Sequence, residues 1–232
     1  MRRTACGGAA LTAIVALAVA AAPAAASRAD CLTKAHHARV LAENVRGILY
    51  SRSGRVSACS YRTGAAHALP GQGPGEIDPV EAHVGPLQGT WAVQLDSIRM
   101  AGTHVGYGLH WTETTTSHRP DTDSRVVSFD FRAGEITYQT TPAEAEGTRV
   151  ASLVAKPNGS VAWIYSSASG VLVVKMDRES GGEERGLDSG NGFGEDYRIE
   201  RRSLALSDDG TRIFWSTYSS ANGPTTVHAR LR

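Results

Sequence analysis

The residues that could do chemistry are spread along the chain instead of forming a known catalytic motif. The 232-residue sequence contains no G-x-S-x-G nucleophile elbow, no H-E-x-x-H zinc motif and no phosphate-binding P-loop. Gly190–Gly194 reads Gly-Asn-Gly-Phe-Gly, but a dinucleotide-binding loop must open a helix, and strand-like sequence surrounds this one. We therefore predict no cofactor and assign no catalytic residue.

Carboxylates are the remaining candidates for acid–base chemistry, and they occur in three short groups. These groups are Glu76–Glu81, Asp188–Asp196 and Asp208-Asp209. A glycosidase needs two carboxyl groups about 5–10 Å apart in a cleft, and only the fold can bring such a pair together. The Asp208-Asp209-Gly210 triplet is also typical of a tight turn between strands.

The longest expected loop, Glu113–Ser124, is the strongest candidate for a binding loop. It contains His118, Asp121 and Asp123, whose side chains can hold a cation or a polar ligand. The alternative is an ordinary solvated loop, because this composition is typical of surface connections. These three residues are therefore candidate ligand-binding residues.

The histidines do not form a metal-binding pattern. The chain has eight of them, and only His36 and His37 are adjacent. His104 and His110 are six residues apart in one expected strand, so alternation places them on the same side of it. We predict no bound metal.

The N-terminal 26 residues have the features of a cleavable secretory signal peptide. Arg2-Arg3 forms a basic start, Ala9–Ala22 is uncharged and apolar, and Ala24–Ala26 provides an A-x-A cleavage site. A retained membrane anchor is the alternative, but the apolar stretch is shorter than the roughly 20 residues of a spanning helix. We expect cleavage after Ala26, which leaves one extracytoplasmic domain over residues 27–232.

Removal of the signal peptide leaves a chain that is almost neutral. Loss of Arg2 and Arg3 reduces the 24 basic residues to 22, against 23 acidic ones, for a net charge of −1. Nucleic-acid and anionic-membrane binding both rely on dense positive charge, so we expect neither partner.

The cysteine count also changes with cleavage. Cys6 leaves with the signal peptide, so Cys31 and Cys59 remain as an even pair. Disulfides persist in oxidising compartments, and we predict a bond between these two residues. The alternative is two separate buried thiols.

Short β-branched and aromatic runs, separated by Gly, Ser, Asp and Asn, dominate the rest of the chain. Strand-like alternation occurs over 126–131, 161–165, 171–176 and 225–229. Only Leu32–Val45 has a helical pattern, and it is weak. The sequence therefore predicts an all-β fold.

An aromatic residue recurs at nearly constant intervals of 57, 56 and 52 residues. The four aromatics are Tyr50, Tyr107, Trp163 and Trp215. A second expected strand follows each of them, over 56–61, 126–131, 171–176 and 225–231. In the first three units an Arg-Gly turn and a further strand come next, over 66–69, 136–140 and 183–187. A four-stranded meander is therefore repeated about four times.

Stacking explains why such units recur. One sheet cannot bury both of its faces alone, whereas units packed face to face around an axis can, as in a small β-propeller-like fold. The four aromatics would then pack between neighbouring units. The alternative is a β-sandwich in which the spacing is accidental. The last unit lacks its final strand, and we predict that His37–Glu43 fills that edge and closes the ring.

Residues 204–216 read Leu-Ala-Leu-Ser-Asp-Asp-Gly-Thr-Arg-Ile-Phe-Trp-Ser. They resemble the Ser-Pro-Asp-Gly repeat of the Tol-system class of propellers, with Asp208 in place of the Pro, and residues 154–163 are a looser copy. The mature chain also resembles uncharacterised secreted proteins of actinobacteria that have a signal peptide, an early Cys pair and Gly-Ser-Val-Ala-Trp-type repeats. The resemblance implies a propeller-like architecture and no particular activity.

These patterns favour a secreted, non-enzymatic binding or scaffold domain. A repeat scaffold with long variable loops and no catalytic motif suits recognition of a protein or a glycan on one rim. We expect a monomer. The alternatives are a carbohydrate-active or other hydrolytic enzyme with carboxylates at the propeller axis, and a purely structural envelope protein.

Overall fold

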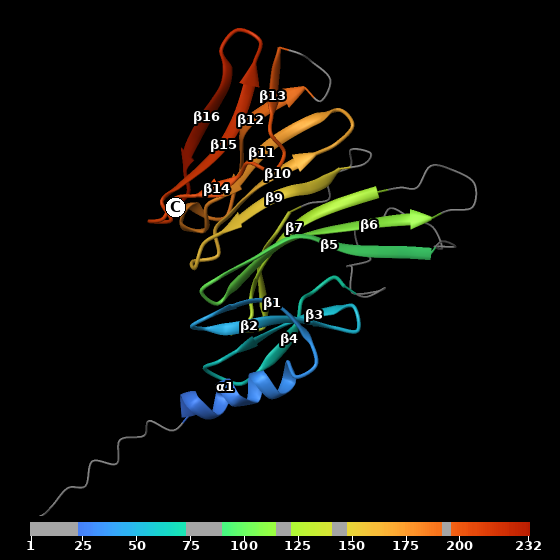
Figure 1. The fold of residues 1–232 in the computed structure, drawn as a ribbon, viewed down its shortest axis with the longest axis vertical. Helices are drawn as coiled ribbons and strands as arrows, with labels where there is room; N and C mark the ends of the chain where they lie inside the picture. The colour runs from blue at the N-terminus through green and yellow to red at the C-terminus, as the bar shows by residue number, and fades with distance from the viewer. Residues whose placement is uncertain (1–22, 73–89, 115–121, 141–147, 192–195) are drawn as a thin grey trace, which may run out of the picture.

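The computed structural model describes residues 23–72, 90–114, 122–140, 148–191 and 196–232 (Figure 1). These residues form one α-helix, one short 3-10 helix and four four-stranded antiparallel sheets. The all-β prediction is therefore confirmed, and so is the division into four units.

The sheets follow one another in chain order. The first consists of β1 (Arg39–Asn44), β2 (Gly47–Arg52), β3 (Arg55–Ser60) and β4 (Ala66–Ala68). The second consists of β5 (Thr90–Ala101), β6 (His104–Thr114), β7 (Thr122–Asp130) and β8 (Glu135–Gln139). The third consists of β9 (Arg149–Ala155), β10 (Val161–Ser166), β11 (Gly170–Met176) and β12 (Glu184–Asn191). The fourth consists of β13 (Tyr197–Ile199), β14 (Ala205–Leu206), β15 (Arg212–Ser219) and β16 (Gly223–Arg230). Helix α1 (Pro23–Lys34) precedes β1, and the 3-10 helix η1 (Arg178–Ser180) lies between β11 and β12.

The first three sheets are meanders in which each strand pairs with the next along the chain. The fourth sheet differs because β16 pairs along the whole of β15, which leaves the other edge of β15 to β13 and β14. These two short strands together take the place of a first strand. The strands expected after each aromatic are present as β3, β7, β11 and β16.

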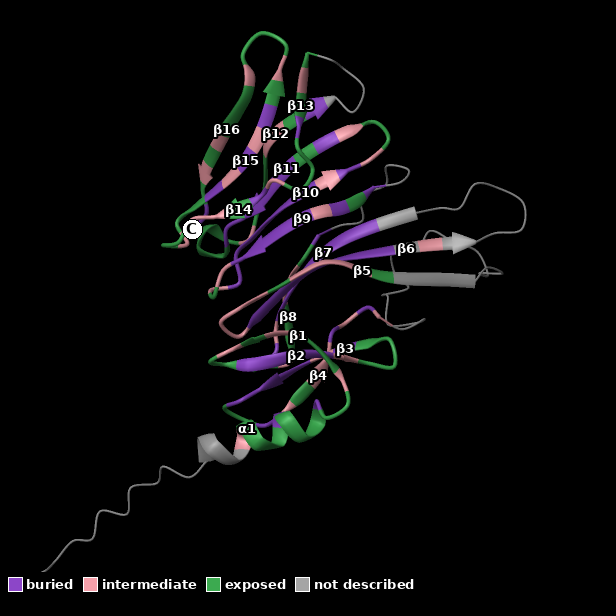
Figure 2. Ribbon diagram, in the orientation of Figure 1, coloured by how far each residue is buried: buried purple, intermediate pink, exposed green. Residues whose placement is uncertain are grey.

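The sheets stack face to face along the long axis of the molecule, and buried residues concentrate in the middle of the stack (Figures 1 and 2). A separate apolar cluster fills each interface between consecutive sheets. In the described residues β16 pairs only with β15, and the first and fourth sheets lie at opposite ends of the stack (Figure 1). The stack is therefore an open arc of propeller-like units.

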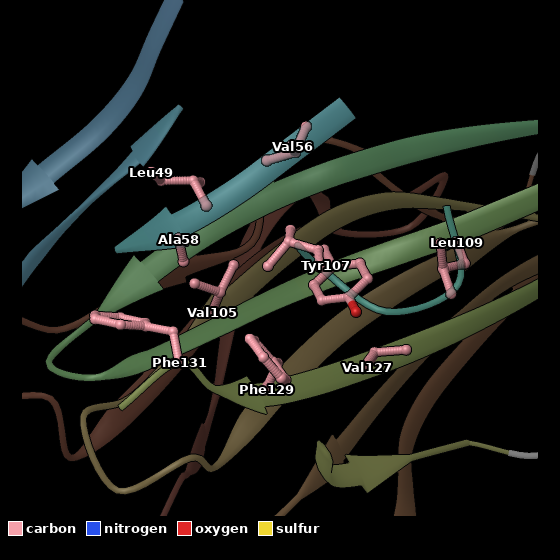
Figure 3. Close-up of a cluster of buried hydrophobic side chains, with 10 residues drawn as sticks. Leu49, Val56, Ala58, Val105, Tyr107, Leu109, Val127, Phe129 and Phe131 are labelled. Carbon is pink, nitrogen blue, oxygen red and sulfur yellow. The ribbon is translucent and has the colours of Figure 1, made fainter. Parts of the chain in front are cut away.

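The recurring aromatics lie in the second strand of each unit and face the preceding layer. Tyr107 on β6 packs against Leu49 and Val56 of the first sheet (Figure 3). Its hydroxyl donates a hydrogen bond to the Pro70 carbonyl at 3.0 Å. Trp215 on β15 likewise donates from Nε1 to Asp188 Oδ2 of the third sheet, at 2.7 Å. Tyr107, Trp163 and Trp215 therefore lie between units as predicted, whereas Tyr50 does not.

Tyr50 has no preceding sheet to pack against, and helix α1 takes that place. The cluster around Tyr50 contains Cys31 and Ala35 from the start of the chain together with Cys59 from β3. The predicted Cys31–Cys59 disulfide is present, with the two Cα atoms 5.6 Å apart. The helix and its disulfide therefore cap the first sheet.

The expected helix over Leu32–Val45 is wrong in its position. The helix ends at Lys34, and Arg39–Asn44 forms β1 instead. Pairing with β2 overrides the weak helical pattern, because tertiary contacts outweigh small differences in local propensity. The helix begins at Pro23 and therefore runs across the expected cleavage position after Ala26.

The predicted closure of the ring by His37–Glu43 is also wrong. Residues Arg39–Asn44 pair with β2, and the Asn44 side chain accepts hydrogen bonds from the backbone N–H groups of Arg46 and Gly47 in the connecting turn. Such a short hairpin costs far less loop-closure entropy than a pairing that joins the two ends of the chain.

A buried ion pair fastens the fourth sheet to the third. The Lys175 ammonium contacts the Asp177 carboxylate and donates to the Arg230 carbonyl at 2.7 Å. Asp177 Oδ1 also accepts a hydrogen bond from the backbone N–H of Arg232 at 2.6 Å. Because both charges are buried and hydrogen-bonded, they hold the end of β16 against the third sheet.

Two glycines on β6 allow the second and third sheets to approach closely. A Cβ at Gly106 would lie 2.9 Å from Leu153 Cδ2, and one at Gly108 would lie 2.6 Å from Val150 Cβ. The Val150 Cβ is fixed to its backbone and cannot move aside. The spacing of these two sheets therefore depends on the missing side chain at Gly108.

Gly108→Ala should lower the free energy of unfolding by about 1–3 kcal/mol, because the added methyl group overpacks the interface with Val150. Urea denaturation followed by tryptophan fluorescence measures this change. Gly186→Ala is the matched control, since a Cβ at Gly186 meets nothing within 4 Å. Equal stability of the two variants would contradict the close approach.

Removal of the disulfide should also destabilise the fold. The bond joins residues 28 apart in the sequence, so the chain-entropy relation assigns it about 3–4 kcal/mol. The double variant Cys31→Ala/Cys59→Ala should lose that much in a denaturant titration, and a reducing agent should then have no further effect. An unchanged midpoint would show that the cap on the first sheet does not depend on the bond.

Candidate functional site: an arginine-lined groove

The first strand of every unit is irregular near the recurring aromatic of the next strand. The pairing register shifts in β1 between Val40 and Ala42 and in β5 between Asp96 and Arg99. It also shifts in β9 where the pairing passes from Ser152 to Val150. In the fourth unit the strand is fully broken between β13 and β14. Such bulges redirect side chains and are common beside functional sites.

The irregularity in β5 is held in a strained conformation. Ser97 has a positive φ of 51°, which is unusual for a residue with a side chain. Its hydroxyl donates a hydrogen bond to the Val150 carbonyl of β9 at 3.0 Å. The bulge is therefore tied to the third sheet, and Asp96 beside it lines the groove described next.

A groove of about 780 Å³ lies where the irregular segments of the last three units meet. Arg99 comes from β5, Arg149 from β9, and Arg201 and Arg202 from the break between β13 and β14. The remaining polar lining consists of serine hydroxyls and one carboxylate, contributed by Ser97, Ser152, Ser166, Ser167 and Asp96.

The arginines leave the groove with an excess of positive charge. All four residues are exposed, and Arg99 Nη1 donates to the Ile98 carbonyl at 2.9 Å. Within the described part of the chain, Arg149, Arg201 and Arg202 form no side-chain hydrogen bond and no ion pair. Guanidinium groups offer five N–H donors suited to carboxylate, sulfate and phosphate oxygens. The groove is therefore suited to an anion.

Asp96 is the only carboxylate in the described lining, and it is poorly solvated. Its Oδ2 atom is buried and has no hydrogen-bond partner. Burial raises the pKa of Asp96, while the nearby His110 and Arg149 act in the opposite direction. A single carboxyl group of this kind provides no acid–base pair within the described groove.

The two histidines of β6 lie on the same face, as predicted from their spacing, and both are buried. His110 Nδ1 is 3.0 Å from the Ser124 hydroxyl on β7. His104 lies between Asp130 and Arg178, and burial lowers its pKa. Both rings lie between the second and third sheets and are part of that interface.

The residues proposed for the long loop are only partly within the described structure. His118 and Asp121 lie outside the described residues. Asp123 belongs to β7, where its backbone is paired with Trp111 of β6. Because β6 extends to Thr114 and β7 begins at Thr122, the bounds Glu113–Ser124 were too wide for the loop.

Two of the three acidic groups have structural roles. Asp188 Oδ2 accepts hydrogen bonds from Tyr197 and Trp215 of the fourth sheet, each at 2.7 Å. Asp209 lies in the predicted tight turn, where hydrogen bonds from Ser207 and Thr211 lower its pKa to about 2. The group Glu76–Glu81 lies outside the described residues.

Sequence reasoning missed the arginine groove, although a signal for it exists. Arg99, Arg149 and Arg201 are separated by 50 and 52 residues, close to the interval of the aromatics. The bulges that bring the arginines together have no local motif. A search for charged residues that recur with the repeat would have identified this set.

Comparison with known proteins gives no relative to guide the assignment, since no protein family and no curated protein sequence matches the chain. In the described residues no helix is long and apolar enough to span a membrane. The same part of the chain holds no group of three or more His, Cys, Asp or Glu residues placed to bind a metal ion.

Asp96→Asn should stabilise the protein more at neutral pH than in acid. Because the pKa of Asp96 is raised above its ordinary 3.8, the native state binds this proton more tightly than the unfolded chain. The stability that protonated Asp96 contributes to the wild type is fully present below pH 3.8 and is lost as the pH rises through the higher native pKa. Asparagine does not ionise, so the variant avoids this loss. Denaturant titrations across this range measure the difference between the variant and the wild type. A difference that does not vary with pH would contradict the assignment.

Proposed function

We propose that the protein is an extracytoplasmic, non-enzymatic binding domain that holds an anionic ligand in the arginine groove. The observation that carries the proposal is the presence of four arginines around one cavity, in whose described lining Asp96 is the single carboxylate. Like charges that line one cavity repel one another, and an anionic ligand between them replaces that repulsion with attraction. The ligand is a glycan or a protein segment that carries acidic groups.

The rest of the chain is consistent with this local use of charge. The net charge expected after cleavage is near zero, so the surface as a whole carries no large positive excess, and the four groove arginines form a local positive region. Such a region steers an anionic ligand toward one site without making the whole surface adhesive to nucleic acid. The signal-like N-terminus and the Cys31–Cys59 disulfide support an oxidising, extracytoplasmic setting.

The hydrolase alternative receives less support from this groove. It requires two carboxyl groups about 5–10 Å apart, and the described lining contains only Asp96. The serine hydroxyls of the lining have no histidine beside them in the groove, so the described residues provide no activated nucleophile. Binding is the chemistry that these side chains support best.

Calorimetric titration with dextran sulfate, and with uncharged dextran as the matched polymer, tests this function. Wild-type protein should bind only the sulfated polymer, and added salt should weaken the binding because it screens the charges. The triple variant Arg149→Gln/Arg201→Gln/Arg202→Gln should lose about 1 kcal/mol per arginine, the upper end for exposed ion pairs.

The control is Arg185→Gln, which removes an exposed arginine from β12 of the third sheet. This variant should bind dextran sulfate as the wild type does. Binding that survives the triple substitution, or equal loss in the control, would place the interaction elsewhere and refute the proposed site.

A further inference from the structure

The arginines of the groove are attached to three successive sheets, which separates them along the stack. Arg99 is on the second sheet, Arg149 is on the third, and Arg201 and Arg202 belong to the fourth unit. Packed sheets lie about 10 Å apart. The positive charge of the groove therefore comes from three layers of the stack instead of from one element.

The size of the groove also exceeds that of a single small anion. Its volume of about 780 Å³ lies within the range of sites that hold molecules of several rings. A lone carboxylate or phosphate would contact one arginine, or one neighbouring pair, and leave the others unneutralised. A ligand that neutralises all four must extend across the three sheets.

The uncharged lining indicates what joins the anionic groups of such a ligand. Serine hydroxyls at Ser97, Ser152, Ser166 and Ser167 can exchange hydrogen bonds with hydroxyl and ether oxygens. No aromatic side chain is found in the described lining, so unstacked nucleic-acid bases have no platform. Among the lining residues that the structure describes, apolar peptide side chains would contact only Val150, Ala151 and Ala168.

We propose that the groove binds an extended acidic oligosaccharide, with anionic groups on separate sugar residues paired with Arg99, Arg149 and the Arg201–Arg202 pair. This inference rests on the proposed function and specifies its ligand class. Asp96 lies on the second sheet, and its carboxylate repels an anionic group beside it. The ligand therefore places its uncharged part next to Asp96. The arginines bind the charges, and the serine hydroxyls and the exposed backbone bind the uncharged sugar oxygens.

A length series of oligogalacturonates tests the proposal. The monomer, trimer and hexamer of galacturonic acid are titrated into wild-type protein, and the fully methyl-esterified hexamer serves as the uncharged control. Binding should tighten by at least about a hundredfold from monomer to hexamer, because linked groups gain from effective concentration. The esterified hexamer should not bind.

Single substitutions examine each contact in the same assay. Arg99→Gln, Arg149→Gln and Arg201→Gln should each weaken hexamer binding by about fivefold, the loss expected for one exposed ion pair, and should reduce the gain from trimer to hexamer. Arg185→Gln should leave both affinities unchanged. Asp96→Asn should tighten the hexamer complex, since it removes the opposing charge.

The possible failures are distinguishable. If the monomer binds as tightly as the hexamer and both need the arginines, the groove is a small-anion site; the extended-ligand proposal is then overturned while the proposed function stands. If a single-stranded DNA oligomer of equal charge binds more tightly through the same arginines, the glycan assignment is wrong. If no anion binds, including dextran sulfate, both proposals fall.

Discussion

The structure depends on one constraint, which is that the apolar faces of the sheets must be buried against a neighbouring layer. The chain meets it by stacking the units in order, and the fourth sheet, at the end of the stack, buries one face and leaves alternate residues of β15 and most of β16 exposed or half-buried. The recurring aromatic of each second strand reaches toward the layer before it. Where there is no earlier sheet, helix α1 and the Cys31–Cys59 disulfide provide that layer for Tyr50.

The same stacking creates the groove. Close packing of the second and third sheets, permitted by Gly106 and Gly108, brings the bulged segments of β5 and β9 into contact through the Ser97 hydrogen bond. The broken first strand of the fourth unit then adds its arginines at the next level. The repeat scaffold thus brings together one irregular segment from each of the last three units, and the site is formed by several units instead of by one loop.

Much of the architecture could be predicted because it is encoded by local patterns. Strands were expected from alternation, turns from Gly and Asp, and the units from the spacing of Tyr50, Tyr107, Trp163 and Trp215. The errors concern long-range choices. From the sequence, the segment Arg39–Asn44 is expected to be helical or to close the ring, but it pairs with β2. A short hairpin costs less loop-closure entropy than a pairing that joins the two ends of the chain. Of the three candidate ligand-binding residues, His118, Asp121 and Asp123, only Asp123 lies in a described strand, and the groove is not identified from the sequence.

The sequence by itself determined the all-β class, the four-unit repeat, the aromatic in each second strand and the pairing of Cys31 with Cys59. The strands and turns follow from side-chain alternation and turn residues, which act between residues near one another in the chain. The units follow from a fixed period, and the disulfide follows from the number of cysteines that remain. Only the tertiary structure decided that the stack stays open and that Arg99, Arg149 and Arg201 line one groove. Their convergence depends on bulges and on sheet spacing, and neither is visible until the units pack together.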